Sequence, residues 1–173
     1  MGGRSCAFLD RDGVINVSPA PGEYVRTWTD FEFNPHAVDW IRFFNALEML
    51  VIVVTNQRGV SLGLVELPDL EAIHRNMCED LLKFGAMVDD VFCCPHAEGS
   101  CECRKPRPGM VLQAARKWNI NISESVMIGD STSDRKLAEN CGMRFIQVAN
   151  GRIVPHPRQG SNQPALQYTG AKR

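Results

Sequence analysis

The chain has 173 residues, of which 44% are hydrophobic, and a formal net charge of −1. This size predicts one domain over residues 1–154, followed by a flexible tail over residues 155–173, which is rich in Pro, Gly, Ser, Gln and Asn. The near-neutral charge argues against a nucleic-acid partner, and the lack of a long apolar run argues against a membrane span or a signal peptide. We therefore expect a monomeric cytoplasmic protein that binds a small molecule.

The first apolar run, residues 7–9, leads directly into Asp10-Arg11-Asp12-Gly13 and predicts a strand that ends in two acids. Two carboxylates this close repel each other unless a cation or a shared proton relieves the repulsion. The pair therefore suggests a metal-assisted site. Asp is also common in solvated turns, and on these residues alone the two interpretations have equal weight. Residues 17–29 are then expected to form a loop near the site.

Strand and helix patterns alternate along the rest of the chain. The apolar periodicity and the start and stop signals predict helices over 35–48 and 68–84, one that opens at 108–109, and one capped by Ser133 that runs to Cys141. Apolar runs predict strands over 50–54, 88–92, 126–130 and 145–148. His74, within the second helix, is expected to be an ordinary surface or boundary residue. The alternation predicts an open, mostly parallel, Rossmann-like α/β sheet with helices on both faces.

In open α/β sheets the ligand site lies outside the carboxyl ends of the strands. In this chain those ends carry Asp10 with Asp12, Thr55 and Asp130. Lys105 lies on the loop after the third strand, where its charge could meet a phosphoryl oxygen. A threonine at a strand end usually caps it and a surface lysine is usually solvated, so only their order along the chain makes the case.

Seven cysteines, four of them within residues 93–103, make a general disulfide framework improbable. Three sulfurs and one imidazole within ten residues suit a tetrahedral structural Zn²⁺, and a chance cluster of reduced thiols is the alternative. The candidate ligands are Cys94, His96, Cys101 and Cys103. Such a closed site would stiffen the loop that carries Arg104 and Lys105. Cys93 is the expected spare neighbour, and Cys6, Cys78 and Cys141 are expected to be small buried residues.

Four motifs occur in a specific order: Asp-x-Asp-Gly at the first strand, Thr-Asn at the second, a Lys before the fourth, and Gly-Asp at its end. Together they resemble the haloacid dehalogenase-like phosphatases over residues 7–151. The longer stretches Asp-Arg-Asp-Gly-Val-Ile-Asn, Val-Val-Thr-Asn-Gln-Arg-Gly-Val and Cys-Glu-Cys-Arg-Lys-Pro-Arg-Pro-Gly-Met resemble more closely the D-glycero-D-manno-heptose 1,7-bisphosphate phosphatases and the related histidinol-phosphatases.

The resemblance implies phosphomonoester hydrolysis through an aspartyl-phosphate. Removal of the C7 phosphate of heptose 1,7-bisphosphate is the expected reaction, and histidinol-phosphate hydrolysis is the alternative. Asp10 would be the nucleophile and Asp12 the general acid and base. Mg²⁺ would be held by Asp10, Asp130 and the backbone carbonyl of Asp12, while Thr55 and Lys105 would bind the phosphate oxygens.

Other positions stay open at this point. Asp134 would either orient the water bound to the metal or merely begin the next helix. The chain has no insertion large enough for a separate cap domain, so substrate selection falls to the loops 17–29 and 58–63 and to the zinc loop. The candidate substrate-binding residues are Asn56, Arg58, Arg104 and Arg107. A catalytically silent, zinc-stabilised binding module is the alternative from another class, and the presence of both Asp10 and Asp12 argues against it.

Overall fold

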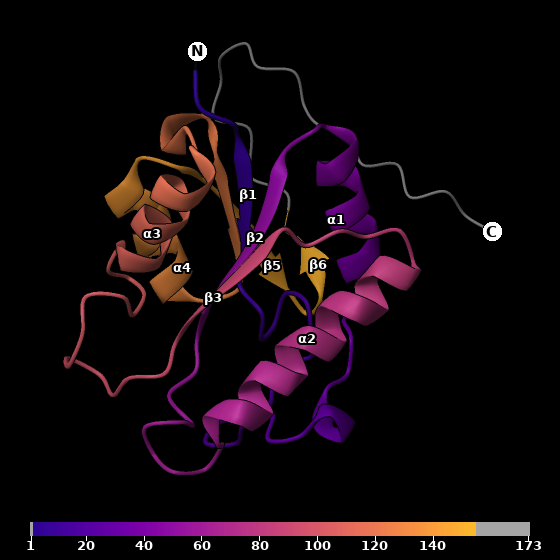
Figure 1. Ribbon diagram of the computed structural model, residues 1–173, viewed down its shortest axis with the longest axis vertical. Helices are drawn as coiled ribbons and strands as arrows, with labels where there is room; N and C mark the ends of the chain where they lie inside the picture. Colours follow the sequence, from indigo (N-terminus) through magenta and orange to yellow (C-terminus); the bar gives the residue numbers. More distant parts are fainter. Residues whose placement is uncertain (1, 155–173) are drawn as a thin grey trace.

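The strands within the described residues form one six-stranded sheet in the order β3-β2-β1-β4-β5-β6 (Figure 1). The computed structural model describes residues 2–154, and the expected tail over 155–173 lies outside the described residues. The strands are β1 (Cys6–Leu9), β2 (Leu50–Asn56), β3 (Asp90–Cys94), β4 (Val126–Gly129), β5 (Arg144–Ala149) and β6 (Arg152–Ile153). All pairs are parallel except β5 with β6. The expected mostly parallel sheet is confirmed, and the antiparallel edge strand β6 is an addition to it.

Helices cover both faces of this sheet, as expected. They are α1 (Ala37–Ala46), α2 (Leu67–Lys83), α3 (Gly109–Trp118) and α4 (Thr132–Cys141), with short 3-10 helices η1 (Trp28–Asp30) and η2 (Ile122–Glu124). Figure 1 shows α1 and α2 on one side of the sheet and α3 and α4 on the other. No large cap domain is inserted between these elements within residues 2–154, and no helix in that range is long and apolar enough to cross a bilayer.

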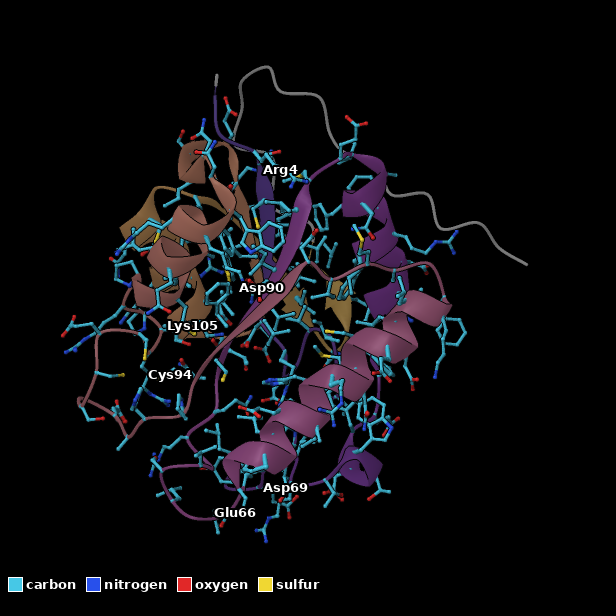
Figure 2. All side chains as sticks on the ribbon, in the orientation of Figure 1. Arg4, Glu66, Asp69, Asp90, Cys94 and Lys105 are labelled. Carbon is cyan, nitrogen blue, oxygen red and sulfur yellow. The ribbon has the colours of Figure 1, made fainter. Side chains whose placement is uncertain are left out.

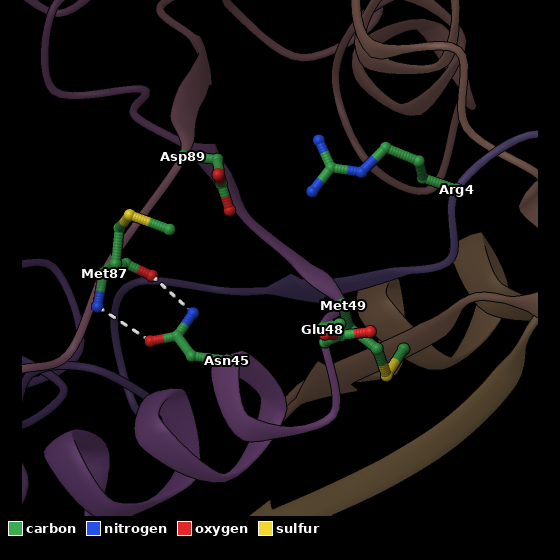
Figure 3. A pocket seen from close by; sticks show the side chains of 6 residues that line it. All are labelled: Arg4, Asn45, Glu48, Met49, Met87 and Asp89. Atoms are coloured by element: carbon green, nitrogen blue, oxygen red, sulfur yellow. Dashed lines mark hydrogen bonds between the residues drawn. The ribbon is translucent and has the colours of Figure 1, made fainter.

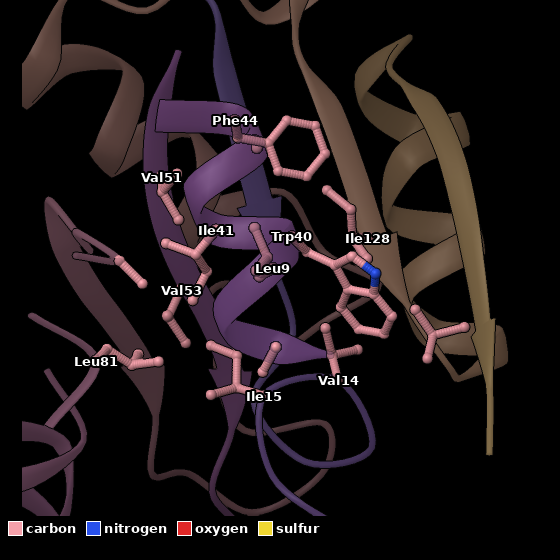
Figure 4. Packing of buried hydrophobic residues seen from close by; sticks show 14 of the residues in the cluster. Leu9, Val14, Ile15, Trp40, Ile41, Phe44, Val51, Val53, Leu81 and Ile128 are labelled. Atoms are coloured by element: carbon pink, nitrogen blue, oxygen red, sulfur yellow. The ribbon is translucent and has the colours of Figure 1, made fainter. Parts of the chain in front are cut away.

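The alternation of side chains along the strands divides the core into two layers. On β1, Ala7 and Leu9 pack with α1 and α2, whereas Cys6 and Phe8 pack with α3 and α4. Figure 4 shows the first layer, where Ile41 and its neighbours on α1 lie against the strands. Burying one such aliphatic side chain contributes about 1.5–3 kcal/mol, so both layers hold the strand ends in fixed positions.

The third strand and the fourth helix begin at residues other than the expected ones. The third strand was predicted over 88–92 but lies two residues later, because β3 starts to pair with β2 only at Asp90 and continues to Cys94. The N-cap of α4 is Ser131 and not Ser133. Only Ser131 has an acid three residues later, Asp134, with which it forms a reciprocal capping box.

The cysteines outside the 93–103 segment differ in burial. Cys6 is fully buried, as expected, whereas Cys78 and Cys141 are only half-buried. Burial raises the pKa of the Cys78 thiol to about 11, so it stays protonated at neutral pH. We find no arrangement around these three cysteines that gives them a part in the candidate site.

Candidate active site

Polar side chains gather at one edge of the sheet, where three parallel strands end. Asp10 follows β1 directly, Thr55 is the penultimate residue of β2, and Asp130 follows β4 directly. Because β1 lies between β2 and β4, these three ends lie side by side. Figure 2 shows Lys105 toward this end of the sheet and Arg4 at the opposite end. The structure thus brings Asp10, Thr55 and Asp130 together at one edge of the sheet, as the sequence predicts, with the loop residue Lys105 toward the same end.

The Lys105 ammonium group lies between two buried carboxylates. Its Nζ is 2.7 Å from Asp10 Oδ1 and 2.7 Å from Asp134 Oδ1, and the residue is 3% exposed. Burial alone would lower the pKa of Lys105, but the two carboxylates outweigh burial and raise it, so the side chain is charged. A fixed positive charge beside a carboxylate at a strand end can bind an oxygen of a phosphoryl group.

Three carboxylates at this edge are close enough to share a cation. One side-chain oxygen from each of Asp10, Asp130 and Asp134 lies within 4.8 Å of the other two. Burial raises the pKa of Asp10 above its usual range despite Lys105, and partial desolvation raises that of Asp130 to about 6, with repulsion from Asp134 adding to both shifts. A divalent cation would favour the ionised acids, and carboxylate oxygens are ligands that Mg²⁺ prefers. The donor set therefore fits magnesium.

Two glycines make room for these acids. Gly13 has a φ of 82°, which residues with a side chain rarely adopt, and a Cβ at this position would overlap the Asp130 carboxylate. A Cβ at Gly129 would likewise overlap the side chain of Asp134. The absence of a side chain at both positions therefore allows the acids to approach the end of the sheet.

The position of Asp134 resolves part of what the sequence left open. This residue is fully buried in the first turn of α4, where its Oδ2 accepts hydrogen bonds from the Ser131 backbone N–H at 3.1 Å and hydroxyl at 2.6 Å. Its Oδ1 faces the Lys105 ammonium group. Asp134 thus begins the helix and also holds Lys105, while a role in orienting a metal-bound water stays a prediction.

The Asp12 carboxylate is held by three side chains. It accepts hydrogen bonds from Arg11 Nη2 at 2.8 Å, from Asn16 Nδ2 at 2.9 Å and from Gln57 Nε2 at 3.0 Å. Burial would raise the pKa of Asp12, but the Arg11 guanidinium and these hydrogen bonds outweigh burial and lower the pKa below its usual range. The resting group is therefore an oriented carboxylate that can take a proton from water.

Residues at the end of β2 connect the groups expected to bind phosphate. Gln57 Nε2 also donates to Thr55 Oγ1 at 2.8 Å. The Asn56 side chain bonds to the backbone of Lys105 in both directions: Oδ1 accepts from the N–H at 3.0 Å and Nδ2 donates to the carbonyl at 3.2 Å. The amide of Asn56 therefore positions the Lys105 loop, and its expected contact with substrate stays a prediction.

The cysteine-rich loop also forms a compact donor cluster. Cys94 Sγ lies 3.4 Å from Cys101 Sγ and 3.2 Å from Cys103 Sγ, and the last two sulfurs are 3.3 Å apart. His96 Nδ1 lies 3.2 Å from Cys103 Sγ and 3.6 Å from Cys94 Sγ. Donors about 2.3 Å from a tetrahedral centre are about 3.8 Å apart, so this spacing is close to that of a closed zinc site. Cys93 is outside the cluster.

The three arginine candidates occupy different environments. Arg107 Nη1 lies 2.6 Å from Glu102 Oε1 and also donates to the Cys101 carbonyl, so it braces the zinc loop. Arg104 is half-buried, and its Nη1 is shielded from solvent without a partner among residues 2–154. Arg58 is exposed. Arg104 and Arg58 are thus available to a ligand, and substrate contact by any of the three stays a prediction.

Two buried polar residues beneath the site, His74 and Arg11, differ from the sequence expectations. His74 was misplaced and Arg11 was missed. His74 is not at the surface or boundary of α2 but is 8% exposed, and its Nε2 lies 3.3 Å from Nη1 of Arg11, which is itself 1% exposed. Burial, with Arg11, lowers the pKa of His74 to about 3, so the imidazole is neutral. The available signal was helical spacing, because position 74 lies next to Ile73 and three residues before Met77 on the apolar face.

Two other missed residues, Asn16 and Gln57, carry a weaker signal. Gln57 directly follows the buried strand β2, and Asn16 ends the turn that follows β1. Both lie within the longer stretches whose sequence resembles the phosphatase family. Their hydrogen bonds to Asp12 could not be derived from that position, since the direction of a side chain beyond a strand end depends on the turn.

A surface hollow of about 420 Å³ lies at the opposite, amino-terminal end of the strands (Figure 3). Its lining residues are Arg4, Asn45, Glu48, Met49, Met87 and Asp89. The Asn45 amide is already bonded to the backbone of Met87 in both directions, at 3.0 and 2.8 Å. None of the predicted site residues lines this hollow, so the candidate active site is the carboxyl edge of the sheet.

Comparisons with known proteins agree with this assignment. A family model described as HAD-hydrolase-like matches residues 102–169. The chain is 43% identical over 137 residues to a D-glycero-alpha-D-manno-heptose-1,7-bisphosphate 7-phosphatase of Mycobacterium bovis, covering 78% of this chain and 72% of that protein. It is 42% identical over 148 residues to the D-glycero-beta-D-manno-heptose-1,7-bisphosphate 7-phosphatase of Rhodopseudomonas palustris, covering 81% of each. The crystal structure of a D,D-heptose 1,7-bisphosphate phosphatase from B. bronchiseptica with magnesium and phosphate matches with a TM-score of 0.77, at 32% identity and over 85% of this chain and 83% of that one.

Proposed function

Because this chain belongs to the heptose 1,7-bisphosphate 7-phosphatases of the haloacid dehalogenase-like hydrolases, we propose that it removes the C7 phosphate of D-glycero-D-manno-heptose 1,7-bisphosphate in a Mg²⁺-dependent reaction. The observation that carries the proposal is the position of Asp10. Its carboxylate lies at the end of a central strand, paired with buried Lys105 and within reach of Asp130. The protein is expected to work in the cytoplasm as a monomer.

In the first step, an oxygen of Asp10 attacks the phosphorus and the bond from phosphorus to the C7 oxygen of the sugar breaks. Asp12 enters this step protonated and gives its proton to the departing oxygen. The negative phosphate near Asp12 raises the pKa of this acid relative to its resting value and so favours the protonated form. The products of the step are the free C7 hydroxyl and a phosphoryl group on Asp10.

In the second step, the Asp12 carboxylate takes a proton from a water molecule, which attacks the phosphorus. The bond between Asp10 and phosphorus breaks, inorganic phosphate leaves, and both acids return to their starting forms. The hydrogen bonds that hold Asp12 in its resting orientation support this role, because a base must lie within hydrogen-bond reach of the attacking water.

Charge on the transferring group requires fixed positive partners. Lys105 and the Thr55 hydroxyl would bind its non-bridging oxygens, and Asp134 and Asn56 hold Lys105 in place for this purpose. Asp10, Asp130 and the backbone carbonyl of Asp12 would hold Mg²⁺, which when bound offsets the negative charge of the acids and the phosphate. The cysteine-rich loop would hold structural Zn²⁺ and so keep the segment that carries Lys105 in a fixed position.

Selection of the substrate falls to loops, because no large cap covers the edge. Arg104 and Arg58 would bind the distal phosphate or hydroxyls of the sugar. Relatives named for the alpha and for the beta anomer have nearly the same identity to this chain, so sequence likeness does not choose between them.

A panel of phosphorylated substrates tests the proposal. The purified protein with Mg²⁺ would be given both anomers of heptose 1,7-bisphosphate and, separately, histidinol phosphate, and the products would be identified by phosphorus NMR. We expect loss of the C7 phosphate with retention of the C1 phosphate. A higher kcat/KM for histidinol phosphate, or loss of the C1 phosphate instead, would contradict the proposed substrate.

A further inference from the structure

Arg11 is a buried charge that the proposed chemistry does not use directly. It is 1% exposed and has the largest of the fully buried side chains among the described residues. A buried guanidinium is costly unless its N–H groups are paired. Nε and Nη2 of Arg11 donate to Asp12 Oδ1 at 3.2 and 2.8 Å, which leaves Nη1 without a partner from that carboxylate.

His74 supplies the partner for the remaining nitrogen. Its Nε2 lies 3.3 Å from Arg11 Nη1, and it comes from the middle of α2, far along the chain. A guanidinium has only donors, so Nε2 of the imidazole must accept the hydrogen bond. This requires a neutral ring with its proton on Nδ1, and the lowered pKa of His74 agrees with that state.

The contacts form one continuous path into the site. His74 contacts Arg11, Arg11 holds Asp12, and Asp12 shares Gln57 with the Thr55 hydroxyl. Because the guanidinium is planar, an acceptor at Nη1 fixes the plane in which Nε and Nη2 meet the Asp12 carboxylate. Loss of that acceptor would leave a buried N–H unpaired and allow the group to shift.

We propose that His74 is a positioning residue for the phosphatase reaction, which fixes the Arg11 guanidinium and through it the Asp12 carboxylate. The inference rests on the proposed role of Asp12 as acid and base. His74 contacts no reacting atom and takes up no proton in the cycle. Its removal should therefore weaken proton delivery to the leaving oxygen while binding of substrate and Mg²⁺ is retained.

The dependence on the leaving group tests this role. In His74→Leu, which has no acceptor, we expect kcat/KM for the sugar bisphosphate to fall about tenfold, a part of the ~10²–10⁴-fold that a general acid supplies. This constant covers the steps through departure of the leaving oxygen and so leaves out the later attack of water, which Asp12 serves with either substrate. With 4-nitrophenyl phosphate, whose leaving oxygen needs little protonation, the fall should be less than about threefold. His74→Gln, whose side-chain oxygen can accept from Arg11, should restore most of the rate. Ile73→Val, a change to the neighbouring buried residue, is the matched control.

Two outcomes would overturn the inference: equal losses of kcat/KM on both substrates, which indicate a purely structural role, or an unchanged kcat/KM for the sugar bisphosphate in His74→Leu. Should the leucine variant fail to fold, nitrogen NMR of the wild-type imidazole decides. We expect Nδ1 protonated and Nε2 bare at neutral pH, and a proton on Nε2 would refute the contact. An inactive wild-type enzyme would instead refute the proposed function, so the two failures are distinguishable.

Discussion

Residues 2–154 contain two clusters suited to metal ions, and the two are built in opposite ways. The zinc donors, from Cys94 to Cys103, lie within ten residues of the chain. The carboxylate cluster combines Asp10 with Asp130 and Asp134, which only the parallel sheet brings together. The first offers four protein donors, enough to fill the coordination sphere of a zinc ion, whereas the second includes the exposed Asp130 and would leave positions for a phosphate.

This difference assigns the two clusters to different tasks. A closed sphere stabilises the loop that holds it and offers no position for a reacting group. An open group of acids beside a buried lysine could bind a phosphate and supply a nucleophile, which is the role proposed for this cluster. The clusters meet at Lys105, two residues after the last zinc donor, so the structural site holds a residue of the reactive one.

The largest effect should come from the nucleophile. Asp10→Asn removes the attacking oxygen, so we expect phosphate release from the bisphosphate to fall by about four orders of magnitude or more. The same change at Asp39, an exposed acid in the first turn of α1, should leave the rate within about twofold. A wild-type rate in Asp10→Asn would show that the carboxylate cluster is not the reactive one.

Next in size is the loss of the charge that joins the clusters. Lys105→Met should lower kcat by about 10²–10³-fold. It leaves Asp10 and Asp134 as buried acids without their partner, at a cost of about 3–5 kcal/mol in the free energy of unfolding. Steady-state kinetics and denaturant titration measure both effects. Lys117→Met is the control, since that lysine is 59% exposed and pairs at the surface with Asp90.

Removal of one zinc donor should have a smaller effect on rate and a clear one on stability. Cys103→Ser should reduce bound zinc from about one equivalent to nearly none, lower Tm and reduce kcat about tenfold, because the loop before Lys105 loses its anchor. Metal analysis and thermal unfolding measure this. Cys93→Ser alters an adjacent cysteine outside the cluster and should keep the zinc. Equal zinc loss in both variants would contradict the four-donor assignment.

Adding a methyl group at Gly13, in the turn after β1, tests whether the carboxylate cluster binds Mg²⁺. In Gly13→Ala the new Cβ would overlap the Asp130 carboxylate, so the Mg²⁺ concentration for half-maximal activity should rise about tenfold. Gly22→Ala is the matched control. Gly22 has a similar positive φ of 87° but no atom within 4 Å of the added Cβ, so it shares the backbone strain, about 1–2 kcal/mol, without the displaced acid. An unchanged Mg²⁺ requirement in Gly13→Ala would count against Asp130 as a ligand.

The last prediction concerns stability and not rate, and it tests the neutral state of the buried His74. His74 has its pKa lowered to about 3 by burial and Arg11, below the value of about 6.5 in the unfolded chain. Between these two pH values the unfolded state binds more protons than the folded state. The free energy of unfolding should therefore decrease as the pH is lowered from about 6.5 to about 3, by up to about 1.4 kcal/mol per pH unit. Denaturant titrations at several pH values should show a shallower decline in His74→Gln. An identical pH slope would contradict the neutral buried state.

The compact cysteine–histidine cluster and the strand-end acids could be predicted because their signals are local. A donor set spaced over ten residues, or an acid directly after a buried apolar run, is visible in a short window of sequence. The sequence prediction places the helix start at Ser133 although the signal for Ser131 is also local, because it does not pair Asp134 with the serine three residues before it. The shift of β3 to Asp90–Cys94 depended on register with β2, which no window reveals.

The sequence by itself determined the order of strands and helices, the edge at which the acids lie and the family to which the chain belongs. Only the tertiary structure decided that Asp134 holds Lys105, that Asn56 is committed to the Lys105 backbone, and that His74 reaches Arg11. The reason is physical: periodicity fixes which face of an element is buried, whereas a contact between side chains far apart in the sequence depends on how the elements pack.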